Sequence, residues 1–245
     1  MSKVSSDLEN TDNKKILFPA LYIVSTPIGN LSDITLRALE VLKQVDLIAC
    51  EDTRHSGILL NHYNIKNKLT SFYEYNKKER TPEIVNLLKQ GKSVALVSDA
   101  GTPGISDPGF YLIREVITQN LSVVPIPGPS ALLSALVISG LASNRFAFEG
   151  FLPKRDGRKN KKLQGLKNET RTMVFYDSPY RVLDSLRDML EIFGDRKMVL
   201  VRELTKKFET VMRGKISEII AQIENSKIKG EIVLVVEGME TTNAH

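Results

Sequence analysis

The chain has 245 residues, of which 42% are hydrophobic and 26% are charged, and it carries a formal net charge of +5. This is the composition of a soluble globular protein, and the length fits one large domain or two smaller ones. No apolar run approaches the roughly 20 residues that a membrane-spanning helix needs, so we expect no membrane contact. The single cysteine, Cys50, excludes an internal disulfide and suits a cytoplasmic protein.

The polar N-terminal segment, residues 1–17, lacks the apolar centre of a signal peptide and predicts a disordered tail. The three histidines and the cysteine match no metal-ligand spacing. We therefore expect no metal site.

Apolar strands and amphipathic helices alternate between residues 18 and 130. The periodicity predicts strands at 20–24, 46–50, 93–98 and 121–126. Helices are expected over 79–90 and after the capping residues Ser32 or Asp33, Asp52 and Asp107. Such alternation predicts a mostly parallel sheet between helices, which makes residues 18–130 an N-terminal α/β domain.

Turns rich in glycine, proline and other small residues follow three of these strands. Their sequences are STPIGN at 25–30, GTPGISDPG at 101–109 and PGPSA at 127–131. One such turn is often no more than a bend before a capped helix. Because ligands bind in open α/β sheets at the carboxyl ends of the strands, several adjacent turns favour a pocket.

The second half, residues 131–240, predicts a C-terminal α/β domain. Strands are expected at 146–151, 172–176, 198–201 and 232–236. The last of these is wholly apolar, so we expect it to be central in its sheet. Helices are expected at the start of this half, over 180–193 and over 215–225.

Residues 154–171 carry eight basic side chains against two acidic ones, a local excess larger than the net charge of the whole chain. A segment of this kind can be a solvated loop or helix face. It can also bind a phosphate backbone by releasing counterions. On the second interpretation, Lys159, Lys161 and Lys162 would contact RNA.

No GxGxxG motif follows the first strand and no GxxxxGK motif occurs, which disfavours the usual dinucleotide and P-loop sites. Seven other blocks occur in an order that resembles one family. They are TPIGNLSDIT (26–35), EDTR (51–54), SDAGTPGISDPG (98–109), PGPSA (127–131), DSPYR (177–181), RELTK (202–206) and GEIVLVVEG (230–238). Over residues 18–238 the chain resembles the bacterial methyltransferases that modify a cytidine 2′-hydroxyl in small-subunit (16S) ribosomal RNA, within the tetrapyrrole methylase superfamily.

The resemblance implies a two-domain tetrapyrrole-methylase-like α/β fold, with a mostly parallel N-terminal domain and a mixed sheet in the C-terminal domain. It implies S-adenosyl-L-methionine bound in a cleft between the domains, a homodimer, and 16S ribosomal RNA or the small ribosomal subunit as partner. The cofactor contacts that it carries onto this chain are Pro27, Gly101, Thr102, Ile105, Ser130, Ala131 and Glu231, with a contribution near Arg213.

One block departs from the superfamily pattern. Thr102 stands where the superfamily usually has an aspartate between glycine and proline. An aspartate contact is therefore missing, and Asp99 or Asp107 is expected to compensate.

Methyl transfer to a ribose hydroxyl requires an acceptor oxygen held in line with the methyl carbon, and a base or cation that helps the proton to leave. The charged residues of the matching blocks are the candidates. We expect Lys206 or Glu203 near the hydroxyl, with Arg54 and Arg181 binding phosphate. Asp52 and Asp177 are further carboxylates in these blocks.

Two other functions remain open from the sequence. The chain could methylate a tetrapyrrole precursor or a protein residue, since a substrate with many carboxylates would also attract basic residues. It could also be a non-enzymatic RNA-binding protein of ribosome assembly, for which the basic segment alone would suffice.

Overall fold

The computed structural model describes residues 17–226 and 228–240, so the segment predicted as a tail lies outside the described residues except at its last position. The chain folds into two compact units. The first consists of residues 17–24, Thr35–Asp99 and Asp107–Ile126. The second consists of Ser25–Ile34, Ala100–Ser106 and residues 127–226 and 228–240. Two loops that follow strands of the first unit therefore belong to the second.

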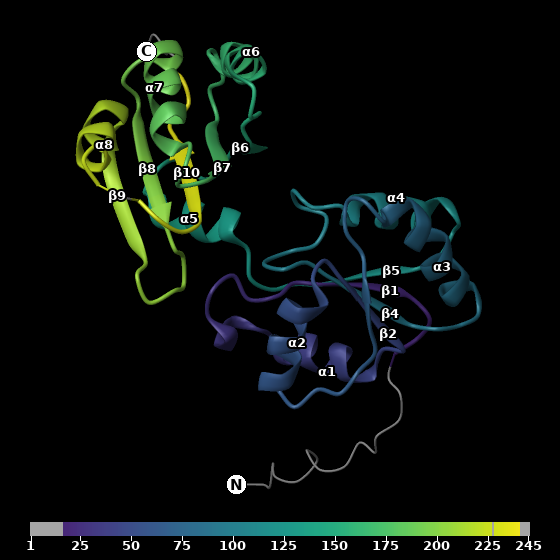
Figure 1. Cartoon of the computed structure of the whole chain (residues 1–245). Helices are drawn as coiled ribbons and strands as arrows, with labels where there is room; N and C mark the ends of the chain where they lie inside the picture. The colour runs from purple at the N-terminus through teal and green to yellow at the C-terminus, as the bar shows by residue number, and fades with distance from the viewer. Residues whose placement is uncertain (1–16, 227, 241–245) are drawn as a thin grey trace, which may run out of the picture. The chain divides into compact units, whose positions relative to one another are not determined.

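The first unit is a parallel five-stranded sheet in the order β3-β2-β4-β1-β5, with α1 and α2 on one face and α3 and α4 on the other (Figure 1). Its strands are β1 (Leu21–Val24), β2 (Leu47–Cys50), β3 (Leu69–Ser71), β4 (Val94–Val97) and β5 (Val123–Ile126). Its helices are α1 (Leu36–Gln44), α2 (Thr53–His62), α3 (Lys77–Lys89) and α4 (Gly109–Thr118). The predicted parallel sheet is confirmed.

Local side chains decide where these helices begin. Asp52 accepts a hydrogen bond from the Arg54 backbone N–H and caps α2 as predicted. Asp107 likewise accepts from the Gly109 N–H at the start of α4. The predicted cap of α1 was wrong, because Ser32 and Asp33 form a separate 3₁₀ turn (Leu31–Asp33), and Thr35 caps the helix instead.

The second unit is a mixed five-stranded sheet in the order β6-β7-β10-β8-β9, in which only β6 and β7 run parallel. Its strands are β6 (Phe146–Phe151), β7 (Thr172–Asp177), β8 (Lys197–Arg202), β9 (Thr210–Lys215) and β10 (Ile232–Val236). Its helices are α5 (Ala131–Ser139), α6 (Asp156–Leu166), α7 (Val182–Phe193) and α8 (Ile216–Ile223). The predicted mixed sheet and the central place of residues 232–236 are confirmed.

Strand β10 shows why this sheet is buried on both faces. Its side chains alternate: Ile232 and Leu234 join the core beneath α6, α7 and α8, whereas Val233 and Val235 join the core beneath α5. All five residues of β10 are buried, which explains the continuous apolar run in the sequence. Ile28, from the loop after β1, completes the core on the α5 side.

The sequence periodicity missed two strands, β3 and β9. Both lie at a sheet edge, and none of their side chains is fully buried. An edge strand with mixed polar and apolar residues has no strong alternation to detect.

Candidate functional site

Three small-residue loops meet within the second unit. Thr26 and Gly101 exchange two backbone hydrogen bonds, of 2.9 and 3.0 Å. The Thr102 hydroxyl lies 2.9 Å from that of Ser25 and donates to the Pro129 carbonyl at 3.4 Å. Loops 25–30, 101–106 and 127–131 therefore form one surface, as the sequence predicted for adjacent turns.

Small residues are needed where these loops approach one another. A β-carbon on Gly128 would lie 2.9 Å from the β-carbon of Ser25, closer than such atoms pack. Gly101 and Gly104 have φ values of +80° and +89°, in the left-handed region that glycine adopts at little cost. The glycines thus permit close main-chain contact and sharp turns.

The residues predicted to bind a cofactor lie on or beside this surface. Ser130 directly precedes α5, and its hydroxyl does not cap the helix. Ala131 and Glu231 line a small pocket together with Ile28 and Leu204. Pro27 and Thr102 are half-buried, Gly101 is buried, and Ile105 is 43% exposed. Arg213 on β9 donates to the carbonyl of Ile138, near the end of α5.

Asp99 and Asp107, the expected substitutes for the missing aspartate, hold backbone groups of the first unit. Asp99 accepts from the Asp52 N–H at 3.2 Å, and Asp107 accepts from the Gly109 N–H at 2.7 Å. Thr102 in the second unit instead uses its hydroxyl to join two loops.

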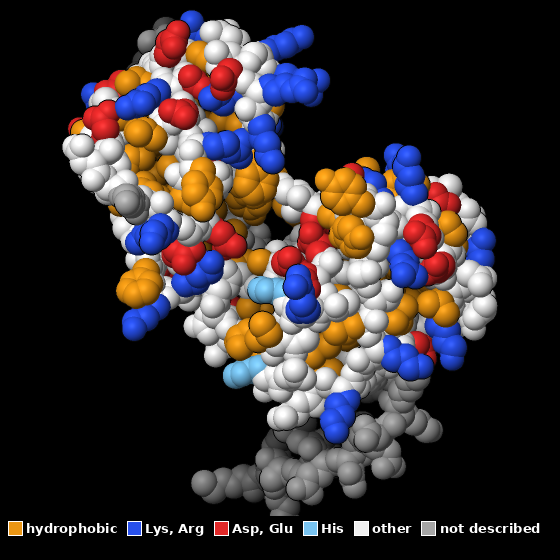
Figure 2. Space-filling view, viewed as in Figure 1, with side chains coloured by type: hydrophobic (Ala, Val, Ile, Leu, Met, Phe, Trp, Pro, Cys, Tyr) orange, Lys and Arg blue, Asp and Glu red, His pale blue; other side chains and the backbone are white. Residues whose placement is uncertain are grey.

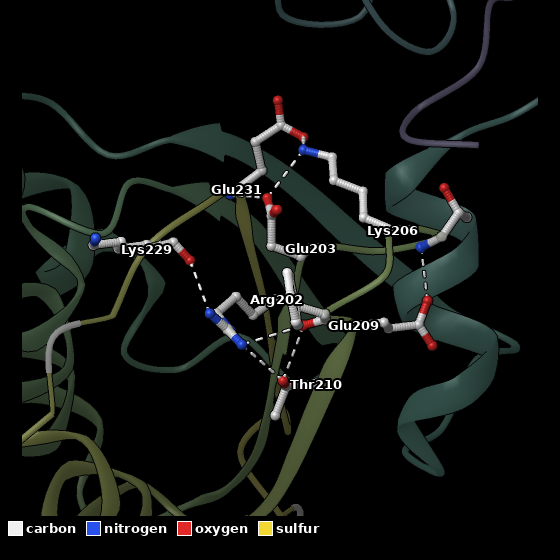
Figure 3. Close-up of polar contacts among 9 residues, drawn as sticks. Arg202, Glu203, Lys206, Glu209, Thr210, Lys229 and Glu231 are labelled. Atoms are coloured by element: carbon white, nitrogen blue, oxygen red, sulfur yellow. Dashed lines mark hydrogen bonds and ion pairs between the residues drawn. The ribbon is translucent and has the colours of Figure 1, made fainter. Parts of the chain in front are cut away.

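Glu203, Lys206 and Glu231 form a polar cluster at the ends of β8 and β10 (Figure 3). The Lys206 ammonium donates to Glu203 at 2.9 Å and to Glu231 at 3.0 Å. The Glu231 N–H donates to the same Glu203 oxygen at 3.0 Å, and the Glu203 N–H donates to the Glu231 carbonyl at 2.9 Å. Glu203 is therefore held at both its main chain and its side chain.

The backbone of this cluster is tightly constrained. Glu203 and Thr205 have φ values of +54° and +63°, which are uncommon for residues other than glycine. A β-carbon on Gly230 would overlap the Glu203 carboxylate. A β-carbon on Gly29 would overlap Cγ of Lys206 and lie 2.7 Å from the Leu204 carbonyl. Loop 25–30 thus packs directly against Lys206 and the two residues before it.

Electrostatics assign charges to the two predicted catalytic residues. Burial lowers the pKa of Lys206, but its hydrogen bonds to Glu203 and Glu231 outweigh burial, and the pKa lies above the usual lysine value. The Glu231 N–H holds the pKa of Glu203 below its usual value, and Lys206 contributes in the same direction. Both shifts favour the charged forms, so at neutral pH Lys206 is an ammonium and Glu203 a carboxylate.

Arg202 and Glu209 support this turn, and the sequence did not single them out for that role (Figure 3). Arg202 donates to the Phe208 carbonyl at 3.2 Å and to the Thr210 hydroxyl at 3.1 Å. Glu209 accepts from the Thr205 N–H at 2.7 Å. Arg202 opens the RELTK block and Glu209 lies three residues after it, so their charge was the available signal, but nothing in the sequence shows that their partners lie within the turn itself.

The two arginines predicted to bind phosphate belong to different units. Arg54 has a 90% exposed side chain and is paired with Asp52 at 2.7 Å. The hydrogen bonds from Arg54 lower the pKa of Asp52 to about 2. Arg181 is 29% exposed, donates to the Leu152 carbonyl at 3.2 Å and faces the buried carboxylate of Asp177 at 3.7 Å.

The three predicted RNA-binding lysines lie on α6 but differ in their surroundings. Lys161 is exposed. Lys159 is only 9% exposed and pairs with Asp188 of α7 at 2.5 Å. Lys162 contacts both the carbonyl and the carboxylate of Glu149 on β6. The basic segment therefore combines an exposed face with buried ion pairs.

Two negative findings apply to residues 17–226 and 228–240. Within them, no helix is both long and apolar enough to span a bilayer. Within the same ranges, no group of three or more histidine, cysteine, aspartate or glutamate residues could hold a metal ion.

The family model of the tetrapyrrole (corrin/porphyrin) methylases matches residues 20–220. Among solved structures, a cobalt precorrin-4 methyltransferase is similar with a TM-score of 0.66 and 15% identity, over 89% of this chain and 95% of that one. Uroporphyrin-III C-methyltransferase from Thermus thermophilus, solved with S-adenosyl homocysteine, has a TM-score of 0.63 and 17% identity over 89% and 97%. These likenesses confirm the fold.

Curated relatives are much closer in sequence. The protein named ribosomal RNA small subunit methyltransferase I from Thermotoga maritima is 53% identical over 90% of this chain and 99% of its own length. The proteins of the same name from Haemophilus influenzae and Vibrio cholerae are 51% and 49% identical, over 89% and 93% of this chain and 78% and 81% of theirs. The chain therefore belongs to the tetrapyrrole methylase family, and within it to the group named ribosomal RNA small subunit methyltransferase I.

Proposed function

We propose that this protein transfers a methyl group from S-adenosyl-L-methionine to the 2′-hydroxyl of a cytidine in 16S ribosomal RNA. The observation that carries the proposal is the Lys206 ammonium, held by Glu203 and Glu231 and packed against loop 25–30. The names of the curated relatives support the substrate class.

The three-loop surface fits the cofactor in its chemistry. Gly101, Gly104 and Gly128 allow the main chain to approach a ligand closely. Ser130 leaves its hydroxyl unused by α5, and the first N–H groups of any helix lack intrahelical partners. These groups, with Pro27, Thr102, Ile105, Ala131 and Glu231, would hold S-adenosylmethionine. When bound, it supplies an electrophilic methyl group on a sulfonium.

Lys206 would act on the acceptor. A ribose hydroxyl becomes negatively charged as its proton leaves, and a fixed ammonium stabilises that charge. Glu203 keeps Lys206 protonated and in place by accepting its hydrogen bond. The Glu231 N–H in turn holds the Glu203 carboxylate in position. The cluster is thus preorganised for a developing alkoxide.

Phosphate contacts would orient the RNA. We keep Arg54, Arg181 and Lys161 of helix α6 as the proposed RNA-facing groups, whereas Lys159 and Lys162, which were also expected to contact RNA, are held in ion pairs within the protein and would position the helix. Arg54 is the most exposed of the predicted arginines. We further propose a cytoplasmic homodimer, which sedimentation of the purified protein and cell fractionation would test.

The deciding experiment offers several acceptors to the purified protein with labelled S-adenosylmethionine. Unmethylated small subunits, free 16S RNA and a tetrapyrrole precursor are compared, and the RNA product is mapped by mass spectrometry. We expect label at one cytidine 2′-oxygen. Label only in the tetrapyrrole, or in a protein, would replace the proposal with the corresponding methylase. Absence of cofactor binding by calorimetry would leave only a non-enzymatic RNA-binding protein.

A further inference from the structure

Helix α6 is held in place by Leu163, which joins the core of the second unit, and by two charged side chains. Among its residues only Lys159 and Leu163 are buried. Lys159 pairs with Asp188 of α7 at 2.5 Å and with Asp156 at 3.3 Å. Burial works against the charge of Lys159, but these two carboxylates raise its pKa above the usual value, so it stays protonated. The helix is thus anchored to α7 by an ammonium that is not available to a partner.

Lys162 provides the second anchor of α6. Its ammonium contacts the Glu149 carbonyl and lies 3.3 Å from the Glu149 carboxylate, with both side chains largely shielded from solvent. The charge of Glu149 is therefore balanced from within the protein. Lys159 and Lys162 together fix the helix against two different elements of the second unit.

The outward side chains of this region have no such partners. Lys154, Arg155, Arg158 and Lys161 are all exposed, and none has an ion pair or side-chain hydrogen bond with another described residue. Arg54, Arg171 and Arg187, by contrast, each pair with a carboxylate at 2.7 Å. Figure 2 shows blue side chains projecting from the surface over α6, at the upper right of this unit.

Arg158 and Lys161 also line an open groove. Its other residues are Glu149, Lys162, Gly165 and Leu166. Arg158, Lys161 and Gly165 are spaced three and four residues apart, which places them on one helix face. A β-carbon on Gly165 would meet no atom within 4 Å, so this part of the groove is open to solvent. The groove thus presents two unpaired cations about one helical turn apart, beside a carboxylate that is already neutralised.

We propose that this groove binds phosphodiester groups of the RNA through Arg158 and Lys161, while Lys159 and Lys162 only position the helix. This inference rests on the proposed function, because the groove would hold the RNA that carries the methyl-accepting hydroxyl. Two adjacent cations fixed on a rigid helix suit a chain of phosphates, which binds by releasing counterions. Arginine adds a planar fork that donates two parallel hydrogen bonds to a phosphate.

The test compares two double variants that remove the same charge. R158Q/K161Q alters the groove, and R37Q/K43Q removes one exposed arginine and one exposed lysine from α1. Binding to a single-stranded 16S RNA fragment is measured between 50 and 200 mM salt, and binding to small subunits is measured in parallel. The slope of log K against log salt is negative, and we expect its magnitude to be smaller by about 1.4 in R158Q/K161Q than in the wild type. Each phosphate contact contributes roughly 0.7 to that magnitude on single strands. The R37Q/K43Q slope should match that of the wild type.

An unchanged slope in R158Q/K161Q, or equal losses in both double variants, would overturn the proposal. Weakened binding to small subunits with unchanged binding to RNA would also overturn it, in favour of an acidic protein partner. The readout is RNA affinity, so it separates from the proposed function. If R158Q/K161Q shows the predicted change of slope but the wild type transfers no methyl group, the phosphate groove stands and the proposed function fails.

Discussion

Gly29 and Lys206 lie far apart in the sequence, yet a β-carbon on Gly29 would overlap Cγ of Lys206. Gly29 belongs to the loop after β1, and Lys206 belongs to the turn after β8. The placement of the proposed catalytic ammonium therefore depends on a residue with no side chain.

We predict that G29A lowers the single-turnover rate of methyl transfer by about 100-fold, because displacing a reacting group by about 1 Å has an effect of that size. The new methyl group would also meet the Leu204 carbonyl at 2.7 Å, so rotation of the Lys206 side chain alone would not relieve the clash. G57A is the matched control. Gly57 lies within α2 with open space around its β-position, and alanine there should stabilise the protein by about 0.5–1 kcal/mol. Equal rates in G29A and the wild type would show that Lys206 is not positioned by this contact.

We predict that K206M lowers the single-turnover rate by about 100- to 1,000-fold, the usual effect of removing one group that stabilises a developing oxyanion. K206R should retain part of the rate, since it keeps a positive charge near the same carboxylates. The raised pKa of Lys206 means that the ammonium persists well above neutral pH, so the wild-type rate should not require its deprotonation. A K206R variant as slow as K206M would instead indicate that lysine itself takes the proton.

Glu203 should make stability depend on pH. Its pKa is lowered in the folded state, so its stabilising contribution is complete above the usual value of 4.5 and is lost as the pH falls through the lower folded value. Urea unfolding at pH 7, 5, 4 and 3 should show a smaller loss of stability in E203Q than in the wild type over the acidic range. E40Q, an exposed carboxylate on α1, serves as the control. Parallel curves for E203Q and the wild type would contradict the assignment.

The Thr102 hydroxyl should contribute to both stability and cofactor binding. T102V removes its hydrogen bonds to Ser25 and Pro129 while keeping its shape, and should cost about 1 kcal/mol of unfolding free energy. Calorimetry should show weaker S-adenosylmethionine binding, because the loops would no longer be tied together. T118V removes a hydroxyl from the exposed surface of α4 and should change neither quantity by much. Unchanged cofactor affinity in T102V would place the cofactor elsewhere.

Lys159 should behave as a structural residue. K159M leaves Asp188 without its partner and should cost about 2–3 kcal/mol, toward the lower end for a broken buried pair because Asp188 is partly exposed. K159M/D188L replaces both charges with apolar groups and should recover most of that loss. The RNA affinity of the double variant should match the wild type. A loss of RNA binding in that folded double variant would show that Lys159 contacts RNA directly.

Helix α6 shows how far sequence patterns reach. Charge counting found the basic segment but treated its lysines alike. Lys159 and Leu163 are four residues apart and therefore share the inner face of the helix, a signal that a helical projection of 156–166 would have revealed. The partners Asp188 and Glu149, however, come from other elements, and no local pattern identifies them.

The sequence by itself determined the α/β class, the central place of β10 and the meeting of the small-residue turns, because burial periodicity and backbone freedom are local properties of the chain. Tertiary structure alone decided that Lys206 is a fixed cation, that Gly29 lies against it, and that one helix carries both anchoring and outward-facing basic residues. Charge state and role depend on which distant groups come within hydrogen-bonding distance, and only the folded chain sets those distances.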